Sequence, residues 1–218
     1  MDKPDSLDIS LFSTDRVHDP FLMPWPVPGN PAALLPFHNY AEWQAFIDVR
    51  RLHPAIPQIV SRKFRRAQNL YLLAWVDFGL LKAGELVALT ALELTLNDRY
   101  GQSFVKQGPG RPGKRSRSEP SLQQLLEHMV NEDGLTDESL AFTKLYGGSV
   151  IPLLYESKTS HGINRTGRLA KAITLAGIRN SLAHGDPFDG LPWSGLLELI
   201  RDLIEYAYRS YLLESRHG

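Results

Sequence analysis

The sequence predicts an all-α fold, an antiparallel helical bundle with a proline-rich N-terminal arm. Apolar residues recur at steps of three to five over several long stretches, which is the spacing of one helix face. We find no stretch with the convincing alternation of apolar and polar residues that marks a half-buried strand. The apolar fraction of 43% and the charged fraction of 22% are ordinary for a globular protein. Consecutive long helices in such a chain are expected to pack antiparallel.

The first 39 residues are expected to form an extension of the bundle. Seven of the 15 prolines fall in the first 36 residues, and proline supplies no backbone N–H for a helix or a central strand. Phe21, Trp25 and Phe37 offer apolar anchors, so we expect an extended arm laid on the helical body. A polyproline stretch that binds a partner is the alternative. Residues 40–218 are assigned to the helical domain.

The next three helices are predicted by their apolar spacing. The first runs from Tyr40 to about Arg51, where two prolines follow. The second, residues 59–81, is amphipathic, and we interpret its basic side as a solvated face. That side carries Arg62, Lys63, Arg65 and Arg66. The third, residues 85–99, is almost entirely apolar, so it should lie buried in the middle until Gly101 ends it.

Residues 106–120 are expected to form a basic flexible loop. The segment 108–117 holds three glycines, two prolines and no large apolar residue, so it cannot form a packed element. If the chain binds RNA, the cations of this loop are candidates for contacts with phosphates. They are Arg111, Lys114, Arg115 and Arg117. A solvated loop without a ligand is the alternative.

Further helical segments are expected after this loop. Residues 121–124 have the spacing of a capping box, which starts a helix. That helix should bury Leu122, Leu125, Leu126 and Met129. Shorter pieces should cover residues 138–146 and 149–156. Another apolar helix is expected from about Leu169, and the last helix covers residues 196–211.

The segment 179–185, which reads Arg-Asn-Ser-Leu-Ala-His-Gly, lies at the end of an apolar helix, because Gly185 and Pro187 are a C-terminal stop. The arrangement resembles the Arg-x4-6-His motif of the HEPN superfamily, small α-helical domains of which many members are metal-independent ribonucleases. Asn180 directly follows the arginine, and the motif lies in the next-to-last expected helix. The resemblance is strongest over residues 59–211. It implies the same all-α class and a homodimer in which two motifs meet.

The resemblance makes Arg179, His184 and Asn180 the candidate catalytic residues of an endoribonuclease. His184 would transfer protons, since an imidazole titrates near neutral pH. Arg179 would hold the phosphate with its planar fork of donors, and Asn180 would orient the phosphate or His184. The product would be a 2′,3′-cyclic phosphate. Because residues five apart on a helix point about 140° from each other, Arg179 and His184 converge only if the helix end frays.

An architectural role for the motif is the alternative. A charge in an apolar helix must be paired, and Glu93 or Asp77 is the candidate partner of Arg179. His184 would then bind the terminal carbonyls of its helix. The chain would be a non-catalytic HEPN-like module that dimerises or binds a partner.

Composition and missing motifs bound the remaining function classes. The chain has 24 basic and 24 acidic residues, so any RNA must be bound by a local patch. It has no cysteine, no His-x3-His pair and no nucleotide-binding glycine loop, so neither a metal nor a cofactor is expected. Without a signal sequence or an apolar membrane span, we expect a soluble, cytoplasmic protein. The resemblance implies toxin-antitoxin or phage-defence settings, with RNA and a cognate antitoxin as further partners.

Overall fold

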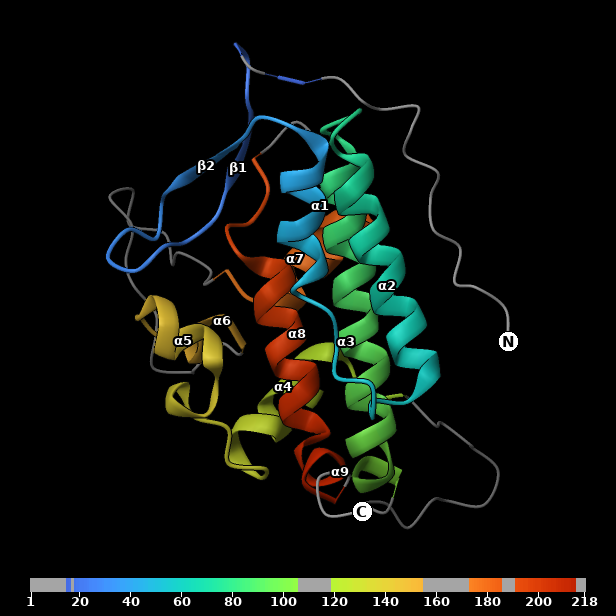
Figure 1. The fold of residues 1–218 in the computed structure, drawn as a ribbon. Helices are drawn as coiled ribbons and strands as arrows, with labels where there is room; N and C mark the ends of the chain where they lie inside the picture. Colours follow the sequence, from blue (N-terminus) through green and yellow to red (C-terminus); the bar gives the residue numbers. More distant parts are fainter. Residues whose placement is uncertain (1–14, 17, 106–118, 155–172, 186–190, 215–218) are drawn as a thin grey trace, which may run out of the picture.

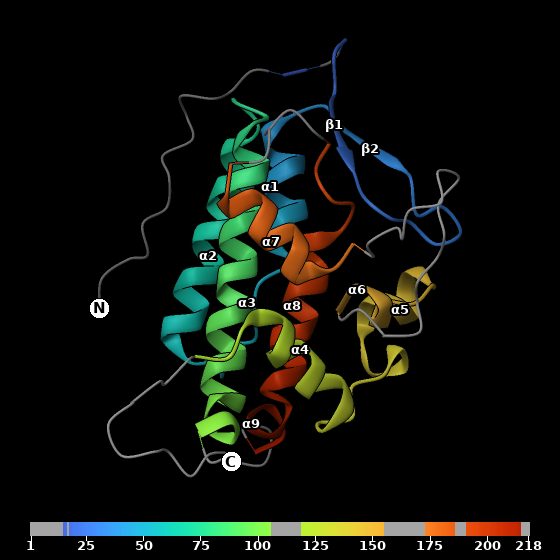
Figure 2. The same ribbon diagram turned by 180° about the vertical axis from the view of Figure 1, so that it is seen from behind.

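The computed structural model describes residues 15–16, 18–105, 119–154, 173–185 and 191–214. Within these ranges the chain is mostly helical, which confirms the predicted all-α class (Figures 1 and 2). Four helices lie side by side along one direction: α1 (Tyr40–Asp48), α2 (Gln58–Leu73), α3 (Leu80–Val105) and α8 (Leu196–Ala207). The shorter helices and a hairpin pack around them.

The proline-rich extension contains a hairpin that the sequence analysis did not predict. Strand β1 (Phe21–Pro24) pairs antiparallel with β2 (Leu34–Phe37), and Phe21 lies opposite Phe37. A two-stranded sheet leaves one edge of each strand unpaired, so prolines can stand in both strands without removing a necessary donor. Leu22 therefore pairs with Pro36, and Pro24 pairs with Leu34.

The described part of the extension shares the hydrophobic core of the helices. Phe21, Trp25 and Phe37 are all buried, which confirms their role as anchors. The rings of Phe21 and Phe37 each lie 5.0 Å from the ring of Trp43 in α1. A domain boundary at residue 39 stays a prediction. The described residues before it form no hydrophobic core of their own, because their buried side chains belong to the core of the helices.

The boundary between α2 and α3 differs from the expected one. α2 ends at Leu73 instead of Leu81, and α3 begins at Leu80 instead of residue 85. The chain turns at Asp77, whose Oδ1 accepts a hydrogen bond from the backbone N–H of Gly79 at 2.9 Å. A side chain that binds its own backbone competes with helix formation. The apolar spacing therefore continues through a turn that separates two helices.

α3 also continues past Gly101, where the sequence predicted its end. A glycine inside a helix costs only about 1 kcal/mol relative to alanine. Tyr100 and Phe104 pack on His128 of α4 (Leu122–Asn131), with ring centroids 5.0 and 5.5 Å apart. We infer that these contacts outweigh the cost of Gly101.

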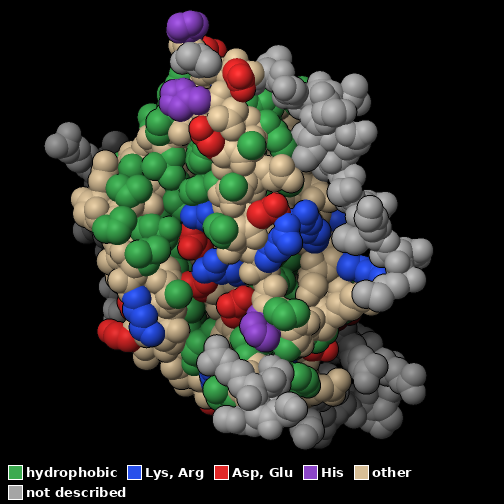
Figure 3. All heavy atoms as spheres, in the orientation of Figure 1, with side chains coloured by type: hydrophobic (Ala, Val, Ile, Leu, Met, Phe, Trp, Pro, Cys, Tyr) green, Lys and Arg blue, Asp and Glu red, His purple; other side chains and the backbone are tan. Residues whose placement is uncertain are grey.

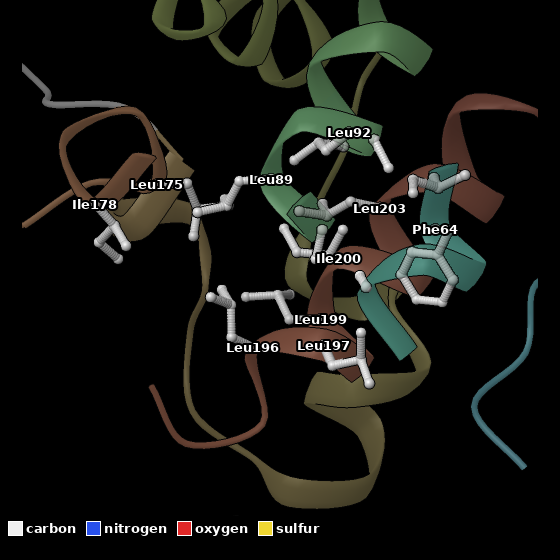
Figure 4. Packing of buried hydrophobic residues seen from close by; sticks show 14 of the residues in the cluster. Phe64, Leu89, Leu92, Leu175, Ile178, Leu196, Leu197, Leu199, Ile200 and Leu203 are labelled. Carbon is white, nitrogen blue, oxygen red and sulfur yellow. The ribbon is translucent and has the colours of Figure 1, made fainter. Parts of the chain in front are cut away.

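α3 occupies the centre of the bundle, as expected for its apolar sequence. It packs against α2, α4, α8 and α7 (Leu175–Ala183). Leu89 and Leu92 are fully buried, and Figure 4 shows them among Leu175 of α7 and Ile200 and Leu203 of α8. The core therefore lies between α3 and the C-terminal helices as well as between α3 and α2.

The prediction of an antiparallel bundle holds for α2 and α3 but not for α3 and α8. Lys82 of α3 reaches the carbonyl of Leu191, just before α8, at 2.7 Å. At the other end, Tyr208 donates to Asp98 of α3 at 2.7 Å. Both helices therefore run in the same direction. The last predicted helix is also divided, because α8 stops at Ala207 and α9 (Arg209–Glu214) follows.

The segments between α3 and α8 follow the sequence analysis in outline. Ser121 and Gln124 form the predicted capping box of α4. That helix buries the expected Leu122, Leu125, Leu126 and Met129. The two short pieces correspond to η2 (Asp137–Ser139) with α5 (Ala141–Tyr146), and to α6 (Ile151–Leu154). The predicted start of the next helix at Leu169 lies outside the described residues, and α7 itself starts at Leu175.

No helix among the described residues is both long enough and apolar enough to cross a membrane.

Gly84 provides a test of the close packing between α2 and α3. A Cβ added there would lie 2.7 and 2.9 Å from two ring carbons of Tyr71, whose side chain is fully buried. Gly84→Ala should therefore destabilise the protein by about 1–3 kcal/mol through overpacking. Gly101→Ala is the matched control, because its nearest foreign atom would lie 3.8 Å away; it should stabilise by up to about 1 kcal/mol. Urea unfolding midpoints measure both, and shifts of the same sign would contradict the tight contact.

Candidate functional site

The candidate catalytic residues lie on α7, with Arg179 and Asn180 near its middle and His184 at its C-terminal end. Thr174 caps the start of this helix, with its hydroxyl accepting from the backbone N–H of Gly177 at 3.1 Å. The buried side of the helix is apolar and consists of Leu175, Ala176, Ile178 and Leu182. The other side faces outward, so Arg179 is half-buried while Asn180 and His184 are exposed.

Arg179 is paired with Glu93 of α3, one of the two carboxylates that the sequence offered as a partner. Its Nε and Nη2 both donate to Oε2 of Glu93, at 3.2 and 2.9 Å. The two side chains are 32% and 23% exposed, so the pair lies at the rim of the core and not inside it. The other candidate, Asp77, bonds to the backbone of Gly79. This ion pair attaches the middle of α7 to the central helix.

The contacts of Arg179 leave one edge of its guanidinium open. Among the described residues, Nη1 has one partner, Oδ1 of Asn180, to which it donates a long hydrogen bond of 3.3 Å. A guanidinium has five N–H donors in a planar fork, and Glu93 occupies the edge formed by Nε and Nη2. The outer edge, formed by Nη1 and Nη2, can still bind two oxygens of a phosphate. Since Glu93 neutralises Arg179, this edge supplies directed donors without a net positive charge.

His184 ends the helix as predicted. It is the C-cap of α7, and its backbone N–H donates to the carbonyls of Asn180 and Ser181 at 3.0 and 3.2 Å. Gly185 follows with a φ of +82°, the left-handed conformation that terminates many helices. No hydrogen bond joins the imidazole to Arg179 or to any other described side chain. The helix stays regular to Ala183 and is not frayed, so Arg179 in the middle of α7 and His184 at its end do not converge in this structure.

The four RNA-binding candidates of the basic loop, Arg111, Lys114, Arg115 and Arg117, lie outside the described residues. Their place relative to Arg179 and His184 stays a prediction from the sequence.

A second ion pair on α3 binds the backbone just before α8, at Leu191 and Trp193. Lys82 and Glu85 are buried side by side, with 3.2 Å between Nζ and Oε2. The carboxylate of Glu85 accepts the backbone N–H of Trp193, and Lys82 donates to the carbonyl of Leu191. Burial raises the pKa of Glu85, against the opposing effects of Lys82 and the Trp193 N–H. α3 therefore fixes α7 through Glu93 and the start of α8 through this pair.

A buried carboxylate that the sequence analysis missed lies on α8. Glu198 is 7% exposed, and one of its oxygens accepts from three donors. These are Nε1 of Trp25 at 3.2 Å, Nε of Arg50 at 3.0 Å and the hydroxyl of Tyr146 at 3.0 Å. The sequence does contain a sign of a buried carboxylate here, because Glu198 interrupts an apolar run from Leu196 to Ile200. The carboxylate is saturated by protein donors, which favours a structural role over a catalytic one.

Two hollows occur near the junction of α8 and α9, and neither contains a motif residue. One, of about 480 Å³, is lined by Arg99, Tyr100, Asp133 and Arg209 among others. The second, of about 490 Å³, is lined by Asp202, Glu205 and the other side of Arg209. Between them Arg209 binds both oxygens of Asp133, at 2.7 and 2.8 Å. These polar residues brace α9 against the loop after α4.

The described residues contain no group of three His, Asp or Glu side chains placed to hold a metal ion.

No family model, no curated protein and no solved structure matches this chain. The resemblance to HEPN domains therefore rests on the motif and its helical setting.

The Asp133–Arg209 pair predicts how stability depends on pH. Partial burial acts to raise the pKa of Asp133, but hydrogen bonds from Arg209 and Tyr100 outweigh it and lower that pKa below its usual value. A carboxyl with a lowered folded-state pKa stabilises the protein above its unfolded pKa of about 3.9, and this stabilisation disappears as pH falls through the folded pKa. Asp133→Asn should therefore be destabilising at neutral pH, and its difference from the wild type should shrink in acid.

Thermal unfolding midpoints between neutral pH and acid measure this difference. Arg209→Met removes the same pair and is the matched variant, and combining it with Asp133→Asn should add little further loss. A difference between Asp133→Asn and the wild type that stays constant with pH would contradict the lowered pKa.

Proposed function

We propose that the protein is a metal-independent endoribonuclease of HEPN type, with Arg179, His184 and Asn180 at its active site. One observation carries the proposal: the half-buried Arg179 has a guanidinium edge, Nη1–Nη2, that no described carboxylate occupies, and it lies five residues, or about 7.5 Å of helix rise, before the exposed His184. A phosphate donor and a group that can transfer protons are thus available together to a ligand. The cellular setting, a toxin-antitoxin or phage-defence system with a cognate antitoxin, is proposed on the resemblance.

The reaction needs no metal if these groups act on the sugar-phosphate backbone. The ribose 2′-oxygen attacks phosphorus while its proton is removed, and the bond from phosphorus to the 5′-oxygen breaks as that oxygen gains a proton. The products are a 2′,3′-cyclic phosphate and a free 5′-hydroxyl. His184 exchanges these protons. Arg179 holds the non-bridging oxygens, and Asn180 orients them.

Two features of the site favour action as a homodimer. The reaction needs both a base and an acid, whereas the described part of α7 offers one histidine, His184. The ion pair with Glu93 also cancels the charge of Arg179, so additional positive charge must come from another source. A second copy placed with its α7 end against the first would supply a second histidine and a second set of guanidinium donors, but no net charge, since its Arg179 is paired with Glu93 in the same way. The basic loop with Arg111, Lys114, Arg115 and Arg117 is a further source of charge.

Cleavage of a labelled RNA in the presence of a metal chelator tests the proposal. His184→Ala should lower the rate by about 10²-fold or more, as loss of an acid-base group does. Arg179→Ala should lower it by about 10²–10³-fold. The product should carry a 2′,3′-cyclic phosphate, which acid treatment converts to a monophosphate.

Arg65→Ala is the matched control for Arg179→Ala. Arg65 forms an ion pair with Asp48 at 3.2 Å and is 38% exposed, which is close to the setting of Arg179. At saturating RNA this variant should keep the wild-type kcat. Equal cleavage by the wild type, His184→Ala and Arg179→Ala, or no cleavage by any of them, would contradict the proposal.

The Glu93–Arg179 ion pair itself favours a second candidate, a non-catalytic HEPN-like module that dimerises or binds a partner. In this role Arg179 braces α7 on α3 and His184 terminates the helix. Because the pair is partly exposed, Glu93→Gln and Arg179→Ala should each cost about 0–1 kcal/mol of stability and should not be additive. Stability losses of this size with no RNA cleavage by the wild type would favour the module.

A further inference from the structure

The exposed side of α2 is the most strongly basic helix face in the described part of the chain. Its 16 residues include four cations and no acid. Arg62 and Arg66 are exposed, and Lys63 and Arg65 lie beside them, half-buried. Figure 3 shows basic side chains gathered over α2 on this side of the molecule.

The α2 cations differ from the other basic residues in their partners. Across the described residues, most arginines outside α2 have an acidic partner. They are Arg50, Arg51, Arg179, Arg201 and Arg209. On α2 only Arg65 has such a partner, Asp48, which it shares with Arg51. Arg62, Lys63 and Arg66 form no ion pair with a described residue.

This arrangement does not serve the stability of the fold. Arg62 and Arg66 are four residues apart, and Lys63 and Arg66 are three apart, so they are neighbours on the helix surface. Like charges at this spacing destabilise a helix by about 0.2–0.5 kcal/mol for each pair. The helix is held by its other side, where Phe64 and Tyr71 are buried. The cations therefore lie on a helix that is fixed by its buried side, and their mutual repulsion destabilises the helix only slightly.

We propose that the α2 face, Arg62, Lys63 and Arg66, binds the phosphate backbone of the RNA substrate. The inference rests on the proposed function, which supplies a polyanionic ligand. It replaces our interpretation of these residues as a merely solvated face. Unpaired arginine forks match phosphate oxygens in geometry and charge. Because the whole chain has zero net charge, RNA needs such a local patch.

The α2 face is a docking surface separate from the reacting bond. α7 lies behind α8 and α3 in Figure 1 and in front of α3 in Figure 2, whereas the α2 cations face the viewer of Figure 3. Contacts on α2 therefore hold a part of the RNA away from Arg179 and His184. Such contacts are the same in the ground state and the transition state, so their loss should raise KM and leave kcat unchanged.

Salt-dependent RNA binding tests the proposal. The probe is a fluorescent single-stranded RNA, and the protein carries His184→Ala so that binding is measured without cleavage. Each lost phosphate contact should reduce the slope of log K against log[salt] by about 0.7. Arg62→Ala combined with Arg66→Ala should therefore reduce it by about 1.4. The control is Lys144→Ala, which removes an exposed cation on α5 and should leave the slope unchanged.

Stability separates loss of binding from loss of fold. The double variant should unfold at the same temperature as its parent or slightly higher, since two like charges are removed. An unchanged salt slope in a folded double variant would overturn the proposal, even if the enzyme cleaves RNA. Equally tight, equally α2-dependent binding of poly-glutamate would also overturn it, since the face would then bind acidic proteins. An α2-dependent slope in a protein that never cleaves RNA would support this surface and contradict the proposed enzyme.

Discussion

The molecule depends on one constraint: charged groups on the central helix leave water and must be neutralised by the segments that cover them. The first half of α3 is mostly apolar, yet it carries Lys82, Glu85 and Glu93 toward the C-terminal part of the chain. Removal of one partner from a buried pair such as Lys82–Glu85 costs about 3–5 kcal/mol, so the segment before α8 has little freedom to shift, whereas the partly exposed Glu93–Arg179 pair holds α7 more weakly. Arg179 meets Glu93, and the backbone before α8 meets the other two. The position of the motif is thus set by the charges of a helix that belongs to the core.

The same rule acts at the opposite side of α8. Glu198 accepts hydrogen bonds from Trp25 just after β1, from Arg50 just after α1 and from Tyr146 of α5. These three segments lie far apart in the sequence. Arg50 also lies over the ring of Phe46, 3.6 Å from its centroid, so its charge is shielded by an aromatic face. The short hairpin is therefore bound to the helices by a polar junction as well as by its aromatic side chains. One carboxylate oxygen thus joins three segments that are distant in the sequence.

The sequence predicted the features that depend on local pattern and missed those that depend on tertiary contacts. The predicted buried positions of α4 are confirmed, because its capping box fixes the start of the helix within a few residues. The predicted end of α7 is confirmed for the same kind of reason, because Gly185 terminates the helix locally. The hairpin was missed because Leu22, the exposed residue between buried Phe21 and Met23, is itself apolar, so burial alternates without any alternation in the sequence. The prolines around these residues also argued against strands. The turn at Asp77 was missed because apolar spacing continues through it. At the candidate site, Glu93 was foreseen as one of two partners for Arg179, but only the packing of α7 on α3 could select it.

The parallel course of α3 and α8 has a consequence for how the chain folds. A helix that follows its neighbour through a short turn can pack at once, as α3 does on α2. Two parallel helices need the chain between them to travel back to the starting end, and here the contacts Lys82–Leu191 and Asp98–Tyr208 each join residues about 110 positions apart in the chain. Closing so long a loop costs entropy before any contact repays it. We therefore expect the α2–α3 pair to form early in folding and the contacts between α3 and α8 to form later.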